Sequence, residues 1–308
     1  MRDESWLLIK KRDALWMRAA ILGEIRSFFL SRDYLEVETP CLIPAPAPEF
    51  HIDTLSCEGW FLHPSPELCM KRLLAAGYER IFQVCRCFRK GERGDRHLPE
   101  FTMLEWYRRG ADYRDLMEEC ADLVIHVAAA LGRGETISYQ GTAIRLHRPW
   151  ERLTVAEAFA RHAPMTVAAA LAGDCFDEVL TAYVEPRLGI AGPTFLYDYP
   201  LPLASLARTK RDNPAVAERC ELYVAGIELA NGFTELAEET EQRRRFAREE
   251  EERRRGGKPP YPVPEKFLQS LPDLGLAAGI ALGLDRLVMI LADAPQIDAV
   301  VAFPPETL

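Results

Sequence analysis

Residues 81–108, IFQVCRCFRKGERGDRHLPEFTMLEWYR, decide the fold of this chain. Two apolar runs, 81–88 and 101–108, have the composition of strands. They flank a charged loop that is too long for an ordinary hairpin turn. Long charged loops between strands are often functional. The stretch therefore predicts two neighbouring strands whose connection carries chemistry.

Further strands and helices are predicted on both sides of this stretch. Apolar residues recur at helical spacing after Asp13, which is a possible N-cap. Apolar and polar residues then alternate, as in a strand, up to Pro40. Strands and helices are each grouped along the chain, which favours an α+β fold with an antiparallel sheet flanked by helices. The expected helices are 13–32 and 65–74, the expected strands are 34–39, 60–62, 194–199 and 221–229, and a strand-turn-helix is expected at 277–292.

The middle of the chain has mostly helical patterns. We expect residues 1–308 to form a single domain with a helical insertion at about 112–190. Residues 238–255 are rich in Glu and Arg at spacings of three and four, which is typical of a solvent-exposed helix. A nucleic-acid-binding patch is the alternative, and the near balance of the two charges disfavours it.

The composition is that of a soluble globular protein. Of 308 residues, 48% are hydrophobic and 28% are charged, which excludes collagen-like and wholly disordered chains. The formal charge of −9 disfavours broad nucleic-acid binding. No apolar run has the length of a membrane span, and the first residues do not resemble a signal peptide. We therefore expect a cytoplasmic protein without a membrane partner.

The eight cysteines and six histidines are dispersed and form no common metal-binding spacing. Cys85 and Cys87 lie two apart in a predicted strand, so they share one face and could be ligands. The sequence shows no second pair to complete a site. We therefore expect structural, reduced thiols and no catalytic zinc.

The chemistry-bearing candidates are two arginines and three glutamates. The chain has no phosphate-binding glycine loop, no dinucleotide fingerprint and no nucleophile elbow. Arg89 lies in the charged loop region and Arg286 begins an apolar helix, while carboxylates gather in residues 221–235. Guanidinium groups neutralise phosphate charge and carboxylates bind Mg²⁺. This combination suits nucleotidyl transfer from ATP.

Four segments together resemble the class II aminoacyl-tRNA synthetases, and among them the lysyl branch. Residues 34–40 (YLEVETP) resemble motif 1, residues 88–105 motif 2, and residues 279–286 (GIALGLDR) motif 3. Residues 226–236 (GIELANGFTEL) resemble the lysine-pocket segment. The motifs occur in order and cover most of the chain.

Within this family the chain most resembles a truncated lysyl-synthetase paralogue, which joins (R)-β-lysine to a lysine of translation elongation factor P. The first predicted helix begins near Asp13, so we expect no anticodon-binding domain. The tripeptide Glu105-Trp106-Tyr107 supports this resemblance. So does Ala281, where lysyl-tRNA synthetases have glycine. One added methyl can redirect specificity, so Ala281 is a candidate determinant for β-lysine over α-lysine.

The resemblance implies a substrate site with an ammonium-binding end. Glu67, in the 65–67 loop, would face the amino group, and Tyr107 with Glu235 would hold the ε-ammonium. Helix capping alone also explains residues 65–67, and an ordinary ion pair with a core tyrosine explains the other two. The implied substrate-binding set is Ser65, Pro66, Glu67, Tyr107, Asn231, Glu235 and Ala281.

The resemblance also implies ATP and Mg²⁺ sites. Arg89 would bind the substrate carboxylate and the α-phosphate, Arg286 the γ-phosphate, and Phe101 would stack on adenine. Glu221 and Glu228 would bind Mg²⁺. The sequence departs from the family at Gly91, where a glutamate is usual, and at Leu98, where an asparagine is common, so we expect altered nucleotide contacts. The implied ATP-binding set is Arg89, Lys90, Gly91, Glu92, His97, Leu98, Phe101, Glu228, Leu229, Gly283 and Arg286.

The expected reaction has two steps: formation of a β-lysyl-adenylate from ATP, and transfer of the acyl group to a lysine ε-amine. The resemblance also implies a homodimer. Three alternatives stay open at this point. They are an enzyme that charges tRNA, a related amide-forming enzyme, and a non-catalytic regulatory paralogue. The motif 2 loop has only three basic residues beyond Arg89, namely Lys90, Arg93 and Arg96, which makes tRNA a less favoured acceptor.

Overall fold

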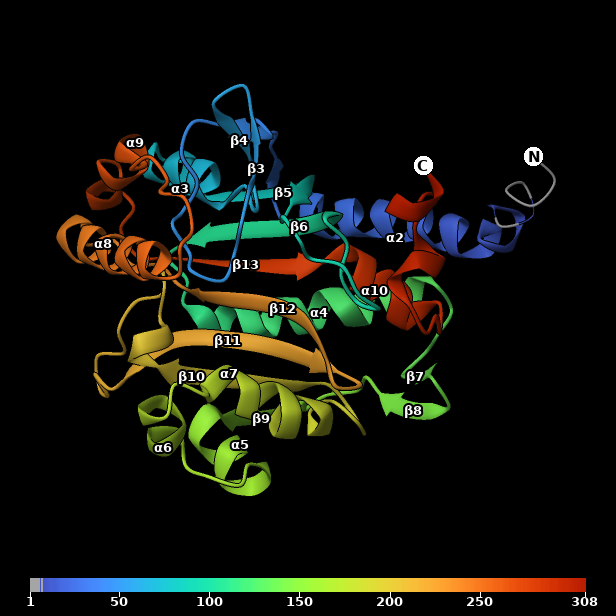
Figure 1. The fold of residues 1–308 in the computed structure, drawn as a ribbon. Helices are drawn as coiled ribbons and strands as arrows, with labels where there is room; N and C mark the ends of the chain where they lie inside the picture. Colours follow the sequence, from blue (N-terminus) through green and yellow to red (C-terminus); the bar gives the residue numbers. More distant parts are fainter. Residues whose placement is uncertain (1–5, 7) are drawn as a thin grey trace.

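The computed structural model describes residue 6 and residues 8–308. Its centre is an eight-stranded sheet with strand order β1-β5-β6-β13-β12-β11-β10-β9 (Figure 1). The motif 2 strands are adjacent in this sheet, as the sequence predicted, and motif 3 lies beside them. The strands are β1 (Leu35–Glu36), β5 (Arg80–Phe88), β6 (Glu100–Arg109), β9 (Glu151–Thr154), β10 (Thr194–Pro200), β11 (Val216–Val224), β12 (Ile227–Thr234) and β13 (Ala277–Gly283).

The sheet is mixed rather than wholly antiparallel. From β5 to β10 each neighbouring pair is antiparallel, as expected, but β1 pairs with β5 and β9 pairs with β10 in parallel. Parallel neighbours need a long crossover connection. The first crossover carries β2 (Leu42–Ile43), β3 (Leu55–Cys57), β4 (Trp60–Leu62) and α3 (Glu67–Ala75), and the second carries α5 (Val155–His162), α6 (Val167–Ala172) and α7 (Phe176–Val179).

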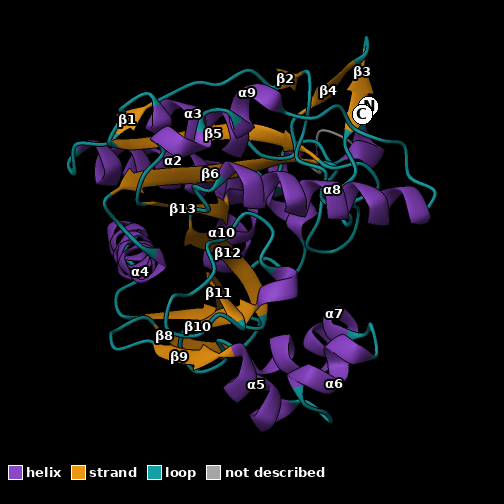
Figure 2. Ribbon diagram, turned by 90° about the vertical axis from the view of Figure 1, so that its left-hand side faces the viewer, coloured by secondary structure: helices purple, strands orange, loops and turns teal. Residues whose placement is uncertain are grey.

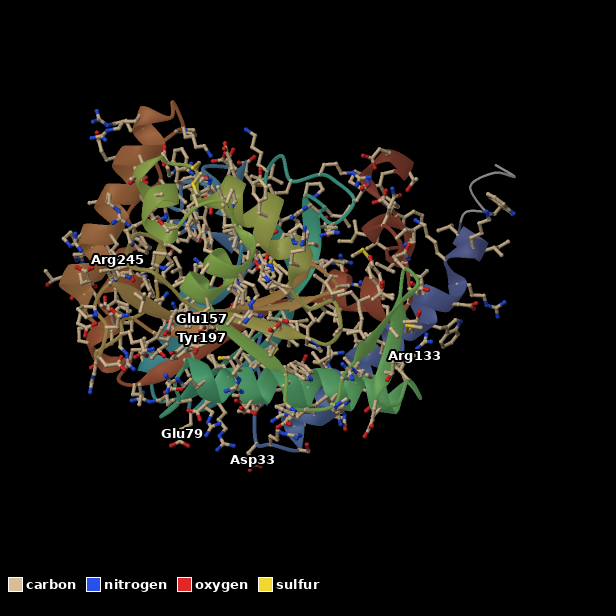
Figure 3. All side chains as sticks on the ribbon, turned by 90° about the horizontal axis from the view of Figure 1, so that it is seen from below. Asp33, Glu79, Arg133, Glu157, Tyr197 and Arg245 are labelled. Carbon is tan, nitrogen blue, oxygen red and sulfur yellow. The ribbon has the colours of Figure 1, made fainter. Side chains whose placement is uncertain are left out.

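Three helices cover one face of the sheet, and the main hydrophobic core lies beneath them. They are α2 (Arg12–Leu30), α4 (Tyr113–Ala130) and α10 (Leu284–Leu291). Asp112 begins α4 with a capping box that Asp115 completes. Viewed from below (Figure 3), charged side chains such as Asp33 and Glu79 point away from this layer. The sheet is therefore sealed on this side.

The opposite face of the sheet is covered only at its two ends. Helices α3, α8 (Glu239–Arg255) and α9 (Glu265–Leu268) lie toward the β5 side, and α5, α6 and α7 lie toward the β9 side (Figure 2). The cleft described below lies between these groups. Short helical turns complete the chain: η1 (Leu180–Val184), η2 (Glu185–Arg187), η3 (Leu201–Leu203), η4 (Leu271–Asp273), η5 (Ile297–Val300) and η6 (Pro305–Thr307).

Residues 112–190 are less uniformly helical than the sequence predicted. The helices are present, but a hairpin of β7 (Thr136–Tyr139) and β8 (Thr142–Arg145) and the edge strand β9 interrupt them. These strands have four residues each, too few for a periodic pattern to stand out. Helix α4 also packs into the main core. Whether the segment is an insertion stays a prediction.

The predicted strand at 221–229 is in fact the end of one strand and the start of the next. Ala225 and Gly226 have positive φ angles of 54° and 68° and form the turn between β11 and β12. This turn lies between Glu221 and Glu228, the two predicted Mg²⁺ ligands. Motif 1 also differs from its prediction, because only two of the six residues expected in a strand pair with β5.

The helix predicted at 13–32 matches α2, but Asp13 lies within its first turn and Lys11 occupies the N-cap position. Boundary errors of this size are normal where no capping side chain fixes the end. No helix in the described part of the chain is both long and apolar enough to span a membrane.

Candidate active site

A cleft of about 690 Å³ lies on the open face of the sheet between α8 and α7. Its floor is made by β6, β11, β12 and β13. Pro66, Lys90, Gly91 and Glu235 do not line it. The other predicted residues do: Ser65, Glu67, Arg89, Glu92, His97, Leu98, Phe101, Tyr107, Glu221, Glu228, Leu229, Asn231, Ala281, Gly283 and Arg286.

Strand alternation places one row of β6 on the cleft floor. Phe101, Met103, Glu105 and Tyr107 are spaced by two and all line the cleft. Glu105 is almost completely buried. The sequence analysis did not predict Glu105 as a site residue. Its spacing of two residues from Tyr107 would have placed both side chains on the same face of the strand.

Glu105 is the centre of a hydrogen-bonded group at one end of the cleft, which we call the amine end. Ser65 Oγ donates to Glu105 Oε1 at 2.6 Å, and the Tyr107 hydroxyl donates to Oε2 at 2.7 Å. Ser65 Oγ also accepts the Glu67 N–H at 3.0 Å. Ser65 therefore accepts a hydrogen bond from the first turn of α3 and is also a partner of Glu105, while Pro66 occupies the N-cap position. Its place in a substrate site stays a prediction.

Lys71 joins two further carboxylates behind this group. Its ammonium pairs with Glu67 and lies 2.5 Å from Glu235 Oε2. Glu235 Oε1 is buried and has no hydrogen-bond partner among the described residues. Lys71 was also missed by the sequence reading, although it lies four residues after Glu67 in α3, where an ion pair is expected.

Gly279 lets these layers come close together. A Cβ atom there would lie 2.1 Å from the Tyr107 ring and 2.8 Å from Glu235 Oε1. These distances are far shorter than ordinary contacts, so any side chain at this position would displace Tyr107. The glycine is therefore required by packing, since its φ is not in the left-handed region.

Burial gives the amine end unusual acid–base properties. Burial raises the pKa of Glu105 to about 8, with the charge of Glu67 adding to it. Burial also raises the pKa of Glu235 to about 8, although Lys71 opposes this shift. Each of these carboxyl groups therefore holds a proton more readily than an exposed one, and a nearby cation favours its charged form. The amine end is thus prepared to accept positive charge.

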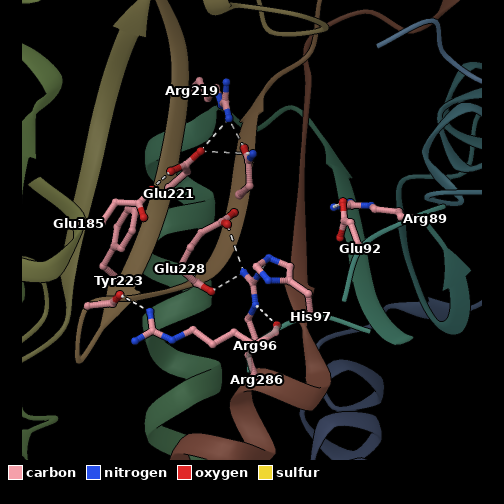
Figure 4. A network of polar contacts seen from close by, with 12 residues as sticks. Arg89, Glu92, Arg96, His97, Glu185, Arg219, Glu221, Tyr223, Glu228 and Arg286 are labelled. Carbon is pink, nitrogen blue, oxygen red and sulfur yellow. Dashed lines mark hydrogen bonds and ion pairs between the residues drawn. The ribbon is translucent and has the colours of Figure 1, made fainter. Parts of the chain in front are cut away.

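The other end of the cleft, the phosphate end, has arginines close to its surface. Arg286 Nη1 donates to the Glu228 backbone oxygen at 2.8 Å and to Glu228 Oε2 at 3.1 Å. Its Nη2 lies 2.7 Å from His97 Nε2. Arg96 donates to the Gly226 oxygen at 3.0 Å, so the motif 2 loop and the β11–β12 turn are joined here (Figure 4).

Arg89 lies across from this group, next to Glu92, as Figure 4 shows. Its guanidinium is 3.7 Å from Glu92 and 5.1 Å from the centre of the Phe101 ring, and its Nε atom is buried without a partner among the described residues. Glu92 thus lies beside Arg89 despite the shift caused by Gly91. Lys90 and Gly91 are exposed, whereas Leu98 is buried.

An irregularity between β11 and β12 places Glu221 and Glu228 on the same cleft. Glu221 pairs with Asn231, and Tyr223 pairs with Glu228, so the register shifts between these pairs. If Glu221 and Glu228 lay in one regular strand, their spacing of seven residues would place them on opposite faces of the sheet. The turn at Ala225 and this bulge place them on the same face instead.

Both oxygens of Glu221 are already engaged. Arg219 donates to Oε1 at 2.7 Å, Tyr223 donates to Oε2 at 2.6 Å, and the Tyr199 hydroxyl also donates to Oε2. Burial raises the pKa of Glu221. Burial would also raise the pKa of Glu228, but Arg286 holds it below its usual value. Glu228 is therefore the charged carboxylate of the pair.

This donor set fits Mg²⁺ through its hard oxygen atoms. Glu228 is ionised and lines the cleft, so it offers an oxygen to a cation. Glu221 offers one only by weakening a tyrosine or arginine contact. Arg219, Tyr199 and Tyr223 were missed by the sequence reading, although Arg219 and Tyr223 alternate with Glu221 along β11.

The chain belongs to the class II aminoacyl-tRNA synthetase family. The model for tRNA synthetases class II (D, K and N) matches residues 8–307, and the mixed sheet with its three ordered motifs agrees with this assignment. The chain is also similar to proteins named elongation factor P–(R)-β-lysine ligase. It is 41% identical to that of Enterobacter sp. (strain 638) and 40% identical to that of Salmonella typhi, with 94% of each chain covered.

Proposed function

We propose that this chain activates (R)-β-lysine with ATP and transfers the β-lysyl group to a lysine ε-amine of translation elongation factor P. The amine end of the cleft carries the proposal. Lys71 balances one of the three carboxylates Glu67, Glu105 and Glu235. A substrate with two ammonium groups supplies the remaining positive charge, which favours a diamino acid. The names of the relatives supply the substrate and the acceptor.

In the first step, a carboxylate oxygen of β-lysine attacks the α-phosphorus of ATP. The bond from that phosphorus to the bridging oxygen breaks, and pyrophosphate leaves. Arg89 balances charge at the carboxylate and α-phosphate, and Arg286 at the γ-phosphate side. Their forked guanidinium groups bind phosphate oxygens without proton transfer. Phe101, beside Arg89, offers its ring to adenine.

Glu228 and Glu221 are the residues that would hold Mg²⁺. When bound, Mg²⁺ would neutralise phosphate oxygens. Glu228 would also orient Arg286, because both its backbone oxygen and its carboxylate accept from that guanidinium.

In the second step, the ε-amine of the acceptor lysine attacks the acyl carbonyl and AMP leaves. That amine attacks only after losing its proton, since its ordinary pKa is about 10.4. Glu49 also lines the cleft. Burial raises the pKa of Glu49 to about 7, so it exchanges protons near neutral pH.

We also propose a homodimer in the cytoplasm. Helix α2 carries large apolar side chains in water: Trp16 is 70% exposed and Ile9 just before α2 is 67% exposed. A second copy would cover them. All eight cysteines are free thiols, which suits a reducing compartment. Light scattering during size-exclusion chromatography would measure the mass, and a monomer at micromolar concentration would exclude the dimer.

The test combines the protein with ATP, Mg²⁺, (R)-β-lysine, elongation factor P and deacylated lysine tRNA. Intact mass spectrometry should find one β-lysyl group added to elongation factor P and no aminoacylated tRNA. A matched reaction with the Arg89→Ala variant should leave the factor unmodified. Charged tRNA with unmodified factor would instead support the tRNA-charging alternative. No gain on either acceptor, with α-lysine also inactive, would support the regulatory paralogue.

A further inference from the structure

A cluster of sulfur and nitrogen ligands lies on β5 outside the cleft lining. Cys85 and Cys87 point to the same face of the strand, and their Sγ atoms are 3.9 Å apart. His63, which follows β4, joins them, and one ligand atom from each of the three residues lies within 4.8 Å of the others. The third ligand comes from a segment remote in sequence, which is why the spacing of the cysteines alone did not reveal the cluster.

The His63 ring is held in a fixed orientation. Its Nε2 atom lies 2.7 Å from the Arg86 backbone oxygen and donates to it, so Nδ1 keeps its lone pair. Its backbone is fixed on both sides, because its N–H donates to the Cys41 oxygen at 2.8 Å and its oxygen accepts from the Phe88 N–H at 3.0 Å. A ring nitrogen that donates to a carbonyl is the usual support of a metal-binding histidine.

We propose that His63, Cys85 and Cys87 bind a thiophilic divalent metal ion of the Zn²⁺ type. Two thiolates at about 2.3 Å from a tetrahedral ion are separated by about 3.8 Å. The observed sulfur separation of 3.9 Å matches this value without movement of the strand. Thiolate and imidazole ligands select such ions over Mg²⁺, which prefers oxygen.

Charge and burial are consistent with this site. Two thiolates and a neutral imidazole would balance the charge of a divalent ion, so the occupied site would be neutral and suits a partly buried place. His63 and Cys87 are buried, and Cys85 is partly exposed, which leaves a route for the ion and a position for water as a fourth ligand.

The site is separate from the cleft but adjacent to it. Cys87 lies opposite Phe101 in the sheet and two residues before Arg89, and His63 lies two residues before Ser65. Both Arg89 and Ser65 line the cleft, whereas the three ligands do not. The metal site therefore fixes two segments that carry the cleft, and it does not depend on which amino acid the enzyme uses.

Cobalt(II) is the probe that tests the proposal, because it replaces zinc and reports thiolate ligation by its colour. The whole chain, stripped of metal with a chelator and kept reduced, is titrated with Co²⁺ and then with Zn²⁺. We expect one equivalent of Co²⁺ to produce thiolate-to-cobalt charge-transfer absorption and Zn²⁺ to abolish it. Zn²⁺ should also protect Cys85 from alkylation by iodoacetamide, as measured by peptide mass spectrometry.

Two matched variants separate this site from adventitious binding. Cys85→Ser should weaken Zn²⁺ binding at least about tenfold, since it removes a direct ligand. Cys57→Ser removes an exposed thiol on β3 outside the cluster and should leave binding unchanged. Circular dichroism melting of both variants confirms that they are folded. Absence of the charge-transfer band in the wild-type chain, or a band that persists in Cys85→Ser, would overturn the proposal.

Discussion

The two ends of the cleft differ in how much of their charge is already paired. At the amine end, Glu105 and Glu235 are buried, and their pKa values are raised to about 8. At the phosphate end, Arg89 and Arg286 are partly exposed and have acidic neighbours within 3.7 Å and 3.1 Å. One end holds buried carboxyl groups with raised pKa values in a packed wall, whereas the other holds ion pairs at the cleft surface.

This difference separates two kinds of recognition. On the proposed function, ligand binding at the amine end should release protons from buried carboxyl groups, so it should depend on pH and on close packing. Binding at the phosphate end should exchange existing ion pairs for pairs with phosphate, so it should depend on forked donors and not on packing. Changes confined to one end should therefore impair one kind of binding and leave the other intact.

The largest effect is expected for Arg89→Ala. Loss of a guanidinium that stabilises charge in the transition state should lower kcat/KM for β-lysine-dependent ATP–pyrophosphate exchange by about 10³-fold. Arg93→Ala is the control in the same loop, since Arg93 pairs with Asp298 and Glu306 away from the cleft. We expect it to retain wild-type exchange. An equal loss of exchange activity in both variants would mean that the activity depends on the conformation of the loop and not on the Arg89 side chain.

Gly279→Ala should have the next largest effect, because it blocks the amine end. The added Cβ meets the Tyr107 ring at 2.1 Å and 2.2 Å, and overpacking of about 3 kcal/mol corresponds to about a 100-fold loss in kcat/KM. Gly94→Ala is the control, because Gly94 does not line the cleft. A Cβ atom there would meet nothing within 4 Å, so we expect this variant to stay active. An active Gly279→Ala enzyme would show that the wall at this end is not closely packed.

Glu105→Gln tests whether substrate binding at the amine end is coupled to proton release. It removes a charge-assisted contact to the substrate ammonium, so KM for β-lysine should rise about tenfold while KM for ATP stays unchanged. In the wild type, β-lysine binding should strengthen as pH rises from 6 toward about 8, because the raised carboxyl pKa values make each binding event release protons below that pH.

Isothermal titration in buffers with different ionisation enthalpies measures this proton release. Substitution by Gln should reduce the number of protons released, because one of the two raised carboxyl groups is gone. Equal proton release in the wild type and Glu105→Gln would assign the protons to another group. Arg89→Ala should leave the release unchanged, since it alters the phosphate end.

The sequence predicted most of the phosphate end and only part of the amine end. Arg89, Phe101 and Arg286 stand in motifs that fix their positions along the chain, so their convergence follows from motif order. Lys71 and Glu105 belong to local patterns, a four-residue helical spacing and a two-residue strand spacing. Such patterns place a residue on a face but do not show what lies opposite it.

The parts that could not be predicted depend on contacts between remote segments. The register shift between β11 and β12 puts Glu221 and Glu228 on one face, and nothing in a strand pattern reveals a bulge. The parallel pairing of β1 and β9 at the sheet edges depends on where the crossovers return. His63 reaches Cys85 and Cys87 in the same way, because two segments meet only in the folded chain.

The smallest effect is expected for Ala281→Gly, which asks whether the amine end also selects the position of the amino group. Ala281 pairs with Glu105 on one side and with Asn231 on the other, so its methyl lies between two residues that line the cleft. Removing one methyl in a substrate site changes discrimination by about 1 kcal/mol, or about fivefold.

We therefore expect the kcat/KM ratio of β-lysine to α-lysine, measured by ATP–pyrophosphate exchange, to fall about fivefold in Ala281→Gly. The proton release on β-lysine binding should stay at the wild-type value, since Glu105 and Glu235 are intact. A variant that keeps the wild-type ratio would remove Ala281 from the specificity determinants. Selection would then depend on the carboxyl groups of the amine end. These groups distinguish β-lysine from α-lysine only by the distance between the two ammonium groups of each substrate.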